Sequence, residues 1–308
     1  MKYDKLFETA KIGSLTLKNR FIMGAMGVGF AEMNGNPTDR TVAYYEERAK
    51  GGYALIITEV TRVQDTEFCT PLEPSLGSDK FIPGWKKVTD AVHAQGAYIF
   101  PQLHQPGRQY TKAILGHDTS APSPIACPVF DETPHELTTE EVWDNIHMFG
   151  DAAVRAKKAG FDGVEIHAGH GYLVQQFLSQ FSNRRFDEFG GSIENRARFA
   201  CEICKDIKKK CGEDYPVIIK LSGEEKVPGG MTISDTKIIA KYLEEAGYDA
   251  IEVTICNYAS LDWMSAPEDE PMGFNAYNAE KIKEGVHIPV AAIDRINTPE
   301  IAEDIIAV

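Results

Sequence analysis

Positive charge is scarce in this sequence of 308 residues. Lysine and arginine number 32 against 46 aspartates and glutamates, which gives a formal net charge of −14 at pH 7. A surface that binds nucleic acid or an anionic membrane needs clustered positive charge, so we expect neither partner. Long hydrophobic runs are also lacking, and no stretch reaches the roughly 18 apolar residues of a membrane span. The first five residues lack the apolar core of a signal peptide.

Cysteine is too sparse for a disulfide framework. Six cysteines in a chain of this length indicate a reducing, cytoplasmic location. Cys201, Cys204 and Cys211 fall on one face of a predicted helix at about 100° per residue. A zinc site would need a fourth ligand and usually a turn between the paired cysteines. We therefore expect buried thiols here and no metal ion.

Apolar runs of strand length alternate with helical patterns along the chain. The seven runs are residues 20–26, 53–61, 97–103, 162–167, 216–222, 249–255 and 288–293. Most lack polar alternation, which indicates strands buried on both faces of a parallel sheet. The helical patterns are residues 39–50, 84–95, 139–159, 195–210, 234–246, 277–284 and 298–307. Residues 138–141 supply a cap, Thr138, and an acidic first turn for the third helix, and Ser234 with Asp235 does so for the fifth.

An internal echo indicates a repeating strand–helix unit. Residues 159–166 (AGFDGVEI) resemble residues 246–253 (AGYDAIEV), and in both a glycine ends a helix shortly before a strand. Such units predict an α/β fold of the (β/α)₈ TIM-barrel type, with a doubly wound open sheet as the alternative. The open sheet would need a Gly-rich phosphate turn after its first strand, and the glycines at 24, 27 and 29 do not make one.

Only seven of the eight units of such a barrel can be counted. The eighth unit is therefore expected to be missing, which would leave two strand edges unpaired. The last helical pattern runs to the end of the sequence without a glycine or asparagine stop signal. We expect residues 1–308 to form one barrel domain and to be the N-terminal part of a longer protein.

The densest group of reactive side chains follows the fourth strand, where barrels carry their chemistry. His167, His170 and Tyr172 stand together in the sequence HAGHGY. Imidazoles can donate to an anionic oxygen, and a phenol can give up a proton. The alternative is two structural histidines and a core tyrosine. A metal site built on the two histidines has no evident third ligand.

Two cations take similar positions after later strands. Lys220 ends the fifth strand, where it could balance an anion, form a Schiff base if desolvated, or simply be solvated. Arg295 follows the seventh strand and precedes a helix start at Thr298, a combination that suits a phosphate.

Other loop residues allow two interpretations each. Tyr258 follows the sixth strand, with Trp263 and Met264, and could bind substrate or pack within a long loop. Arg184 and Arg185 are expected to anchor their loop rather than bind a ligand.

Four stretches together carry a family resemblance. They are LKNR at residues 17–20, Gln102-Leu103 with Gly107-Arg108, the His167/His170/Tyr172 group, and NRRFDEFGGSIENR at residues 183–196. Over essentially all 308 residues the chain resembles the old yellow enzyme family of FMN-dependent NADH:flavin oxidoreductases. Within it, the chain is most similar to the 2,4-dienoyl-CoA reductase and 2-enoate reductase branch.

The resemblance implies an FMN-binding barrel that uses NAD(P)H. His167 and His170 match the pair that grips the activating oxygen of the substrate, and Tyr172 matches the proton donor. Residues that match the family's flavin contacts are Ala25, Met26 and Gly27 under the ring, Val60, Gln102 at the pyrimidine edge, Lys220 near N1 and Arg295 by the phosphate.

The chain also departs from the family pattern. Gly27 stands where the family often has Thr, Cys or His, and Lys220 replaces a commoner arginine, keeping the charge but losing the forked geometry. The sequence holds neither the eighth strand with its phosphate-binding Gly-Arg nor the cysteine cluster of the longer branch. A four-iron cluster and FAD are expected only beyond residue 308.

The expected function is that of an ene-reductase. Hydride would pass from NAD(P)H through FMN to the activated C=C bond of a small enoate, enone or enoyl-CoA, in a chain that could form a homo-oligomer. One alternative is an FMN-dependent amine dehydrogenase. Others are a Schiff-base lyase that uses Lys220, and a truncated barrel fragment without flavin or activity.

Overall fold

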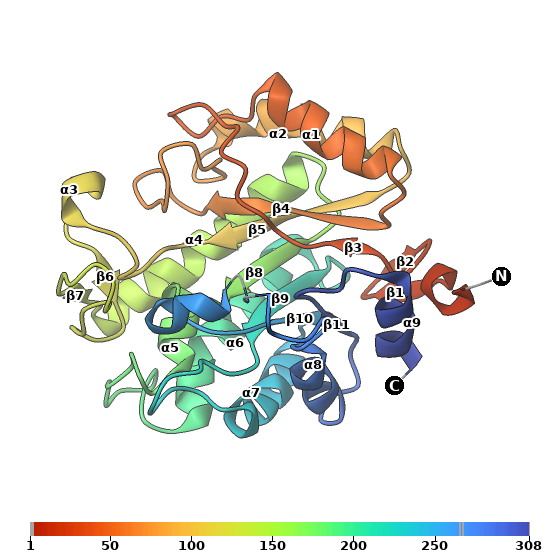
Figure 1. Cartoon of the computed structure of the whole chain (residues 1–308). Coiled ribbons are helices and arrows are strands. Elements are labelled where there is room, and N and C mark those ends of the chain that lie inside the picture. The colour runs from red at the N-terminus through yellow and green to blue at the C-terminus, as the bar shows by residue number, and fades with distance from the viewer. Residues whose placement is uncertain (1–2, 265, 267, 308) are drawn as a thin grey trace.

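A curled parallel sheet with helices along its outer side forms the body of the chain (Figure 1). This computed structural model describes residues 3–264, 266 and 268–307. Met1 and Lys2, part of the start discussed above, lie outside that range. The sheet consists of β3 (Ile22–Met23), β4 (Leu55–Arg62), β5 (Tyr98–His104), β8 (Val164–Ala168), β9 (Val217–Ser222), β10 (Ala250–Thr254) and β11 (Val290–Ala292). Each strand overlaps one of the seven predicted runs.

The strand order shows how the sheet is wound. It runs β11-β10-β9-β8-β5-β4-β3, and every neighbouring pair is parallel. A doubly wound sheet reverses direction at a switch point, whereas this order never reverses. The winding is therefore that of a barrel with seven units. Its edge strand β11 is only half-buried, whereas β8, β9 and β10 are buried throughout.

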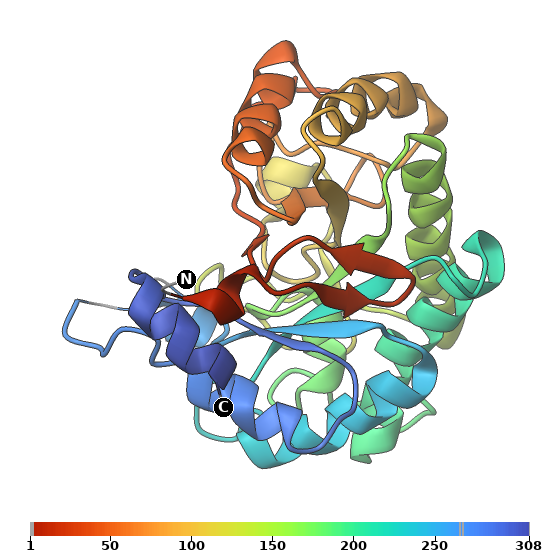
Figure 2. The same cartoon turned by 90° about the vertical axis from the view of Figure 1, so that its right-hand side faces the viewer.

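The helices that follow these strands lie outside the sheet in both views (Figures 1 and 2). They are α1 (Asp39–Lys50), α2 (Ile82–His93), α4 (Thr139–Lys158), α6 (Ile193–Cys211), α7 (Ile233–Ala246), α8 (Ala276–Lys283) and α9 (Pro299–Ala307). Thr138 caps α4 as predicted, with Glu141 completing a capping box. In α7 the predicted cap Ser234 was wrong, because Thr232 is the N-cap, but Asp235 lies in the first turn as predicted and completes a capping box with Thr232. None of the described helices is long and apolar enough to cross a membrane.

An N-terminal hairpin that the sequence analysis missed covers one end of the sheet. Its strands β1 (Ala10–Ile12) and β2 (Leu15–Leu17) are antiparallel. Ile12 and Leu17 pack in one hydrophobic cluster with residues at the starts of the parallel strands, among them Leu55, Ile218 and Ala250 (Figure 2). The hairpin thus fills the N-terminal end of the sheet, so the opposite, C-terminal end is the one left for a site.

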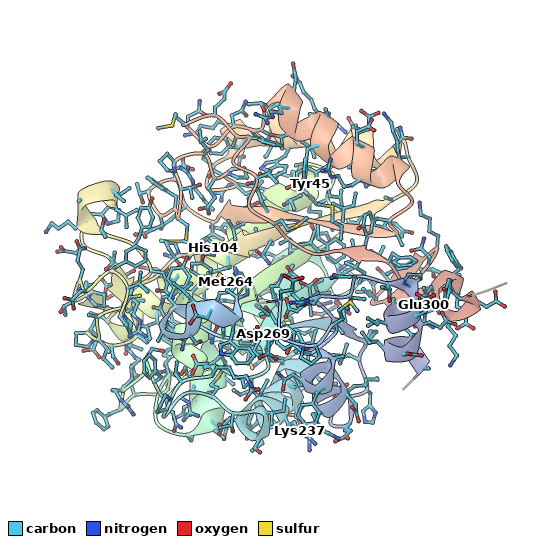
Figure 3. All side chains as sticks on the ribbon, in the orientation of Figure 1. Tyr45, His104, Lys237, Met264, Asp269 and Glu300 are labelled. Carbon is cyan, nitrogen blue, oxygen red and sulfur yellow. The ribbon has the colours of Figure 1, made fainter. Side chains whose placement is uncertain are left out.

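The first and last segments of the described chain lie side by side. Glu300 on α9 (labelled in Figure 3) accepts a hydrogen bond from the Tyr3 hydroxyl. Glu303 accepts from the backbone N–H groups of Lys5 and Leu6, in the short helix η1 (Asp4–Phe7), at 3.2 and 3.3 Å. These contacts tie the helix that follows β11 to the segment that precedes β3.

The three cysteines of α6 lie on its buried face, as predicted. Cys204 is fully buried, and Cys201 and Cys211 are nearly so. Burial raises the pKa of Cys201 to about 12 and that of Cys204 still further. These thiols therefore belong to the packing between α6 and its neighbours.

Arg185 anchors the loop between α5 (Leu173–Leu178) and α6. Its guanidinium donates to the carbonyl oxygens of Pro122 and Leu137 and pairs with Asp187. These carbonyls belong to the excursion that carries α3 (Lys112–Leu115), β6 (Ser120–Ala121) and β7 (His135–Glu136). Arg185 is thus a loop anchor as predicted, and the side chain of Arg184 is exposed.

Asp187 makes this anchor sensitive to acid. Burial acts to raise the pKa of Asp187, but hydrogen bonds from Arg185 and Thr139 outweigh burial and lower this pKa to about 2. A carboxyl group with a depressed pKa in the folded state stabilises the fold above its unfolded pKa, and that contribution is lost as the pH falls through the folded pKa.

We expect Asp187→Asn to lower the free energy of unfolding at pH 7 by about 1 to 2 kcal/mol, allowing for solvent screening. The difference from the wild type should shrink between roughly pH 5 and pH 2. Urea denaturation at several pH values measures it, with Asp144→Asn on the same α4–α6 side of the fold as a surface control. A difference that stays constant with pH would contradict the argument.

Candidate active site

A sharp turn after β8 brings the predicted reactive side chains together. His167 lies within β8, His170 has a φ of 58° and Gly171 a φ of 78°, and α5 begins directly after Tyr172. The left-handed pair reverses the chain within two residues. The ring centroids of His167 lie 5.1 Å from His170 and 5.0 Å from Tyr172, and those of His170 and Tyr172 lie 6.5 Å apart.

Both histidines of this cluster are held neutral. Burial, with the neighbouring His170, His104 and Lys220, keeps the pKa of His167 well below its usual value. Burial and the charge of Lys220 lower the pKa of His170 to about 3. The Nδ1 atom of His167 accepts a hydrogen bond from the Gly169 N–H at 3.3 Å. The proton of the neutral ring is thereby assigned to Nε2, which can donate it to an oxygen.

Tyr172 is set up as a protonated phenol. Burial raises its pKa well above the usual value, so the hydroxyl keeps its proton at neutral pH. That hydroxyl lies 2.7 Å from the hydroxyl of Tyr258, in the short helix η3 (Tyr258–Trp263). The neighbouring Cys69 also acts to raise the pKa of Tyr172. The structure therefore places Tyr258 against the candidate proton donor, whereas Trp263 packs on Phe274 at 6.0 Å.

Lys220 lies next to the histidines but is not solvated. The parallel register pairs His167 of β8 with Lys220 of β9. The Lys220 ammonium is buried and lies 2.6 Å from Glu252. Burial acts against the charge, but Glu252 and Glu165 outweigh it and raise the pKa of Lys220. A Schiff-base lysine needs a lowered pKa, so this environment speaks against the lyase alternative.

A buried chain of polar groups extends from Lys220 to β5. The Gln102 side-chain amide donates to Glu165 Oε1 at 2.7 Å. Burial, followed by the charge of Glu252, raises the pKa of Glu165 to about 8. Gln102, Glu165, Lys220 and Glu252 thus form one network across four neighbouring strands, with one carboxyl group largely protonated at pH 7.

The segment after β3 offers open space for a flat ring. Ala25 packs on the hydrophobic cluster below it, and the side chain of Met26 is 55% exposed. A Cβ added to Gly27 would meet no described atom within 4 Å. A cavity of about 570 Å³ borders Gly27, Glu59 and Val60, which is in the size range of small-molecule sites. The open glycine, the Gln102 amide and the Lys220 ammonium fit a flavin at this end of the sheet.

Arg295 lies in the turn between β11 and α9. Asp294 and Arg295 have φ values of 81° and 52°, so the chain turns sharply here. Thr298 accepts a hydrogen bond from the Ile301 N–H, which confirms the helix start predicted after Arg295. Asp294 accepts from Asn275 at 2.9 Å, and burial raises its pKa to about 6. Contact of Arg295 with a phosphate stays a prediction.

Sequence reasoning missed three residues beside Tyr172. Cys69 Sγ lies 3.1 Å from His104 Nε2, and the His104 ring contacts Tyr172 edge-on at 4.4 Å. Glu73 accepts a hydrogen bond from the Cys69 N–H at 2.7 Å, and burial raises its pKa to about 8. Cys69 and Glu73 follow β4, and His104 ends β5. The sequence offered one signal for these residues, namely that they lie at or after the C-terminal ends of strands.

Comparison with known proteins identifies the family. Residues 5–308 match the NADH:flavin oxidoreductase / NADH oxidase family. The chain belongs to this family. It is 43% identical to an NADH oxidase of Thermoanaerobacter brockii over 99% of the chain and 47% of that protein. It is 40% identical to a cinnamate reductase of Clostridium sporogenes over 99% of the chain and 49% of that protein.

Similar solved structures confirm the fold. A 2-naphthoyl-CoA reductase complex matches 99% of the chain and 48% of its own, with a TM-score of 0.94 and 32% identity. Histamine dehydrogenase from Rhizobium sp. 4-9 matches 100% and 45%, at 0.89 and 28%. An old yellow enzyme homologue from Zymomonas mobilis matches 97% and 84%, at 0.82 and 28%. The predicted barrel class and family resemblance are confirmed, and the chain spans about half the length of the two curated relatives above.

Proposed function

We propose that this chain is the FMN-binding barrel of an ene-reductase that reduces an activated C=C bond with NAD(P)H. The observation that carries the proposal is the cluster of two neutral imidazoles and one protonated phenol, whose ring centroids lie within 6.5 Å of one another. Relatives named cinnamate reductase and 2-naphthoyl-CoA reductase support an enoate or acyl-CoA substrate. A cytoplasmic location stays part of the proposal.

FMN would be held at the C-terminal end of the sheet. The residues proposed to contact it are Ala25, Met26, Gly27, Val60, Gln102, Lys220 and Arg295. When bound, FMN supplies a carrier that takes hydride from NAD(P)H and delivers it to the β-carbon of the substrate. Lys220 would place a positive charge beside the ring, shared with its ion-pair partner Glu252.

The protein's own side chains would bind the carbonyl oxygen of the substrate and supply the proton for its α-carbon. His167 and His170 donate hydrogen bonds to the carbonyl oxygen of the substrate, where negative charge develops during the reaction. Tyr172 gives its hydroxyl proton to the α-carbon. Tyr258, predicted to bind substrate, lies 2.7 Å from that hydroxyl and is half-buried. It can therefore line the substrate pocket and return a proton to Tyr172.

An amine dehydrogenase is the second candidate, favoured by the likeness to histamine dehydrogenase. The two functions differ in what reduces the flavin. We expect the FMN-loaded protein, mixed without oxygen, to be bleached by NADH or NADPH and recoloured by cinnamate, an enone or an enoyl-CoA. We expect no bleaching by histamine or trimethylamine.

The same absorbance measurement separates the outcomes. Bleaching by an amine without nicotinamide would reverse the assignment. A protein that stays colourless after incubation with FMN would support the alternative of a truncated barrel fragment that binds no flavin. Borohydride trapping of a carbonyl compound on Lys220 would support the lyase reading, which the raised pKa of Lys220 opposes.

A further inference from the structure

A ligand set for a metal ion lies beside the proposed proton donor. We propose that Cys69, Glu73 and His104 form a binding site for a divalent cation of the zinc type. Each offers one ligand atom, and the three atoms lie within 4.8 Å of one another. Neither the family motifs nor the proposed ene-reduction uses this cluster.

The fold holds the three side chains in place. His104 is the last residue of β5, and it pairs in register with Arg62 at the end of β4 (Figure 3 labels His104). Cys69 and Glu73 stand on the loop that leaves β4. The loop is closed on itself because the Cys69 N–H donates to Glu73 Oε2 and the Glu73 N–H donates to the Thr70 carbonyl at 3.1 Å. Binding would therefore need little rearrangement.

Incomplete hydrogen bonding points independently to a ligand. Glu73 is 1% exposed and His104 is fully buried. Within the described part of the chain, Glu73 Oε1 and His104 Nδ1 are buried and have no hydrogen-bond partner. Native proteins satisfy most buried polar atoms, so two orphans in one three-residue cluster call for an explanation. A cation held by the carboxylate would satisfy the first of them.

The donor atoms select the kind of ion. A thiolate, an imidazole and a carboxylate are ligands that Zn²⁺ takes in proteins, whereas Mg²⁺ and Ca²⁺ prefer oxygen alone. One thiolate and one carboxylate would balance a dication. The carboxyl groups of Glu59 and Glu67 lie near the cluster and favour a cation, while the guanidinium of Arg62 opposes it.

A four-coordinate zinc ion with three protein ligands keeps one coordination position open, and Tyr172 lies close to this site. The ring of Tyr172 lies edge-on to the ligand His104 at 4.4 Å, and Tyr172 is also a neighbour of Cys69. If the proposed function holds, an ion at this site would lie next to the proton donor and would block access to it. Binding itself does not depend on that function.

The test uses the FMN-loaded chain and Zn²⁺ alone. We expect equilibrium dialysis with metal analysis to find one ion per chain in the wild type. Affinity should fall roughly tenfold or more in Cys69→Ser and in Glu73→Gln. Cys201→Ser, which removes another buried thiol on α6, should bind as the wild type does.

A second readout reports the ligands directly. Co²⁺ in a tetrahedral site with a thiolate should absorb at longer wavelength than oxidised flavin, and Cys69→Ser should remove that absorption. Circular dichroism and FMN content check that each variant folds, and Glu73→Gln decides the question if Cys69→Ser does not. The absence of stoichiometric binding to the wild type, or equal binding by Cys69→Ser and the wild type, would overturn the proposal.

Discussion

Replacing Tyr172 with phenylalanine is expected to slow oxidation of the reduced protein by an enone about 10²- to 10⁴-fold, the usual contribution of a positioned general acid. The substitution removes one hydroxyl and keeps the ring that packs on His104 and His167. The buried phenol keeps its proton at neutral pH because burial raises its pKa. Reduction by NAD(P)H should change little, because no proton from Tyr172 is needed there.

Rapid mixing of the two half-reactions measures this prediction. Tyr258→Phe is the matched control, since it removes the neighbouring hydroxyl and leaves the proton of Tyr172 in place. We expect it to slow reoxidation by about tenfold or less, within the range of one lost neutral hydrogen bond. If Tyr172→Phe is reoxidised at the wild-type rate, Tyr172 is not the acid.

The barrel architecture of this molecule could be predicted from the sequence because its strand–helix unit repeats. Buried strands of a parallel sheet read as continuous apolar runs, such as VIIKLS at β9, and each is followed by an amphipathic helix. The cluster His167, His170 and Tyr172 was visible for a similar reason, since one short turn holds all three residues. Signals of this kind are local, so the linear sequence displays them.

Contacts between distant segments were not visible in the same way. The hairpin β1–β2 has three-residue strands, too short for a periodic pattern, and its role comes from packing against β4, β9 and β10. Cys69 and His104 are 35 positions apart and meet because β4 and β5 pair. The prediction that Lys220 ends its strand was wrong by two residues, because β9 continues to Ser222, and its partner Glu252 lies on the next strand. Neither residue type nor spacing shows which carboxylate will face a lysine across a sheet.

That buried pair leads to the second large effect. Lys220 and Glu252 are 3% and 2% exposed, and their charged atoms lie 2.6 Å apart. Removing one partner of a buried ion pair leaves an uncompensated charge, which typically costs about 3 to 5 kcal/mol. Without Lys220, the charge of Glu252 has no cation beside it, and the nearby Glu165 is another carboxyl group. Burial and the charge of Glu252 already raise the pKa of Glu165 to about 8, so the site disfavours further negative charge.

We therefore expect Lys220→Met to lower the free energy of unfolding by about 3 to 5 kcal/mol, measured by urea denaturation of the FMN-loaded protein at pH 7. The double variant Lys220→Met with Glu252→Leu should regain much of that loss, because it buries no unpaired charge. Lys237→Met is the control, since Lys237 pairs with Glu284 at 2.9 Å on the surface, where such pairs contribute about 1 kcal/mol or less. If Lys220→Met lowers the free energy of unfolding no more than Lys237→Met does, the ion pair with Glu252 does not stabilise the fold.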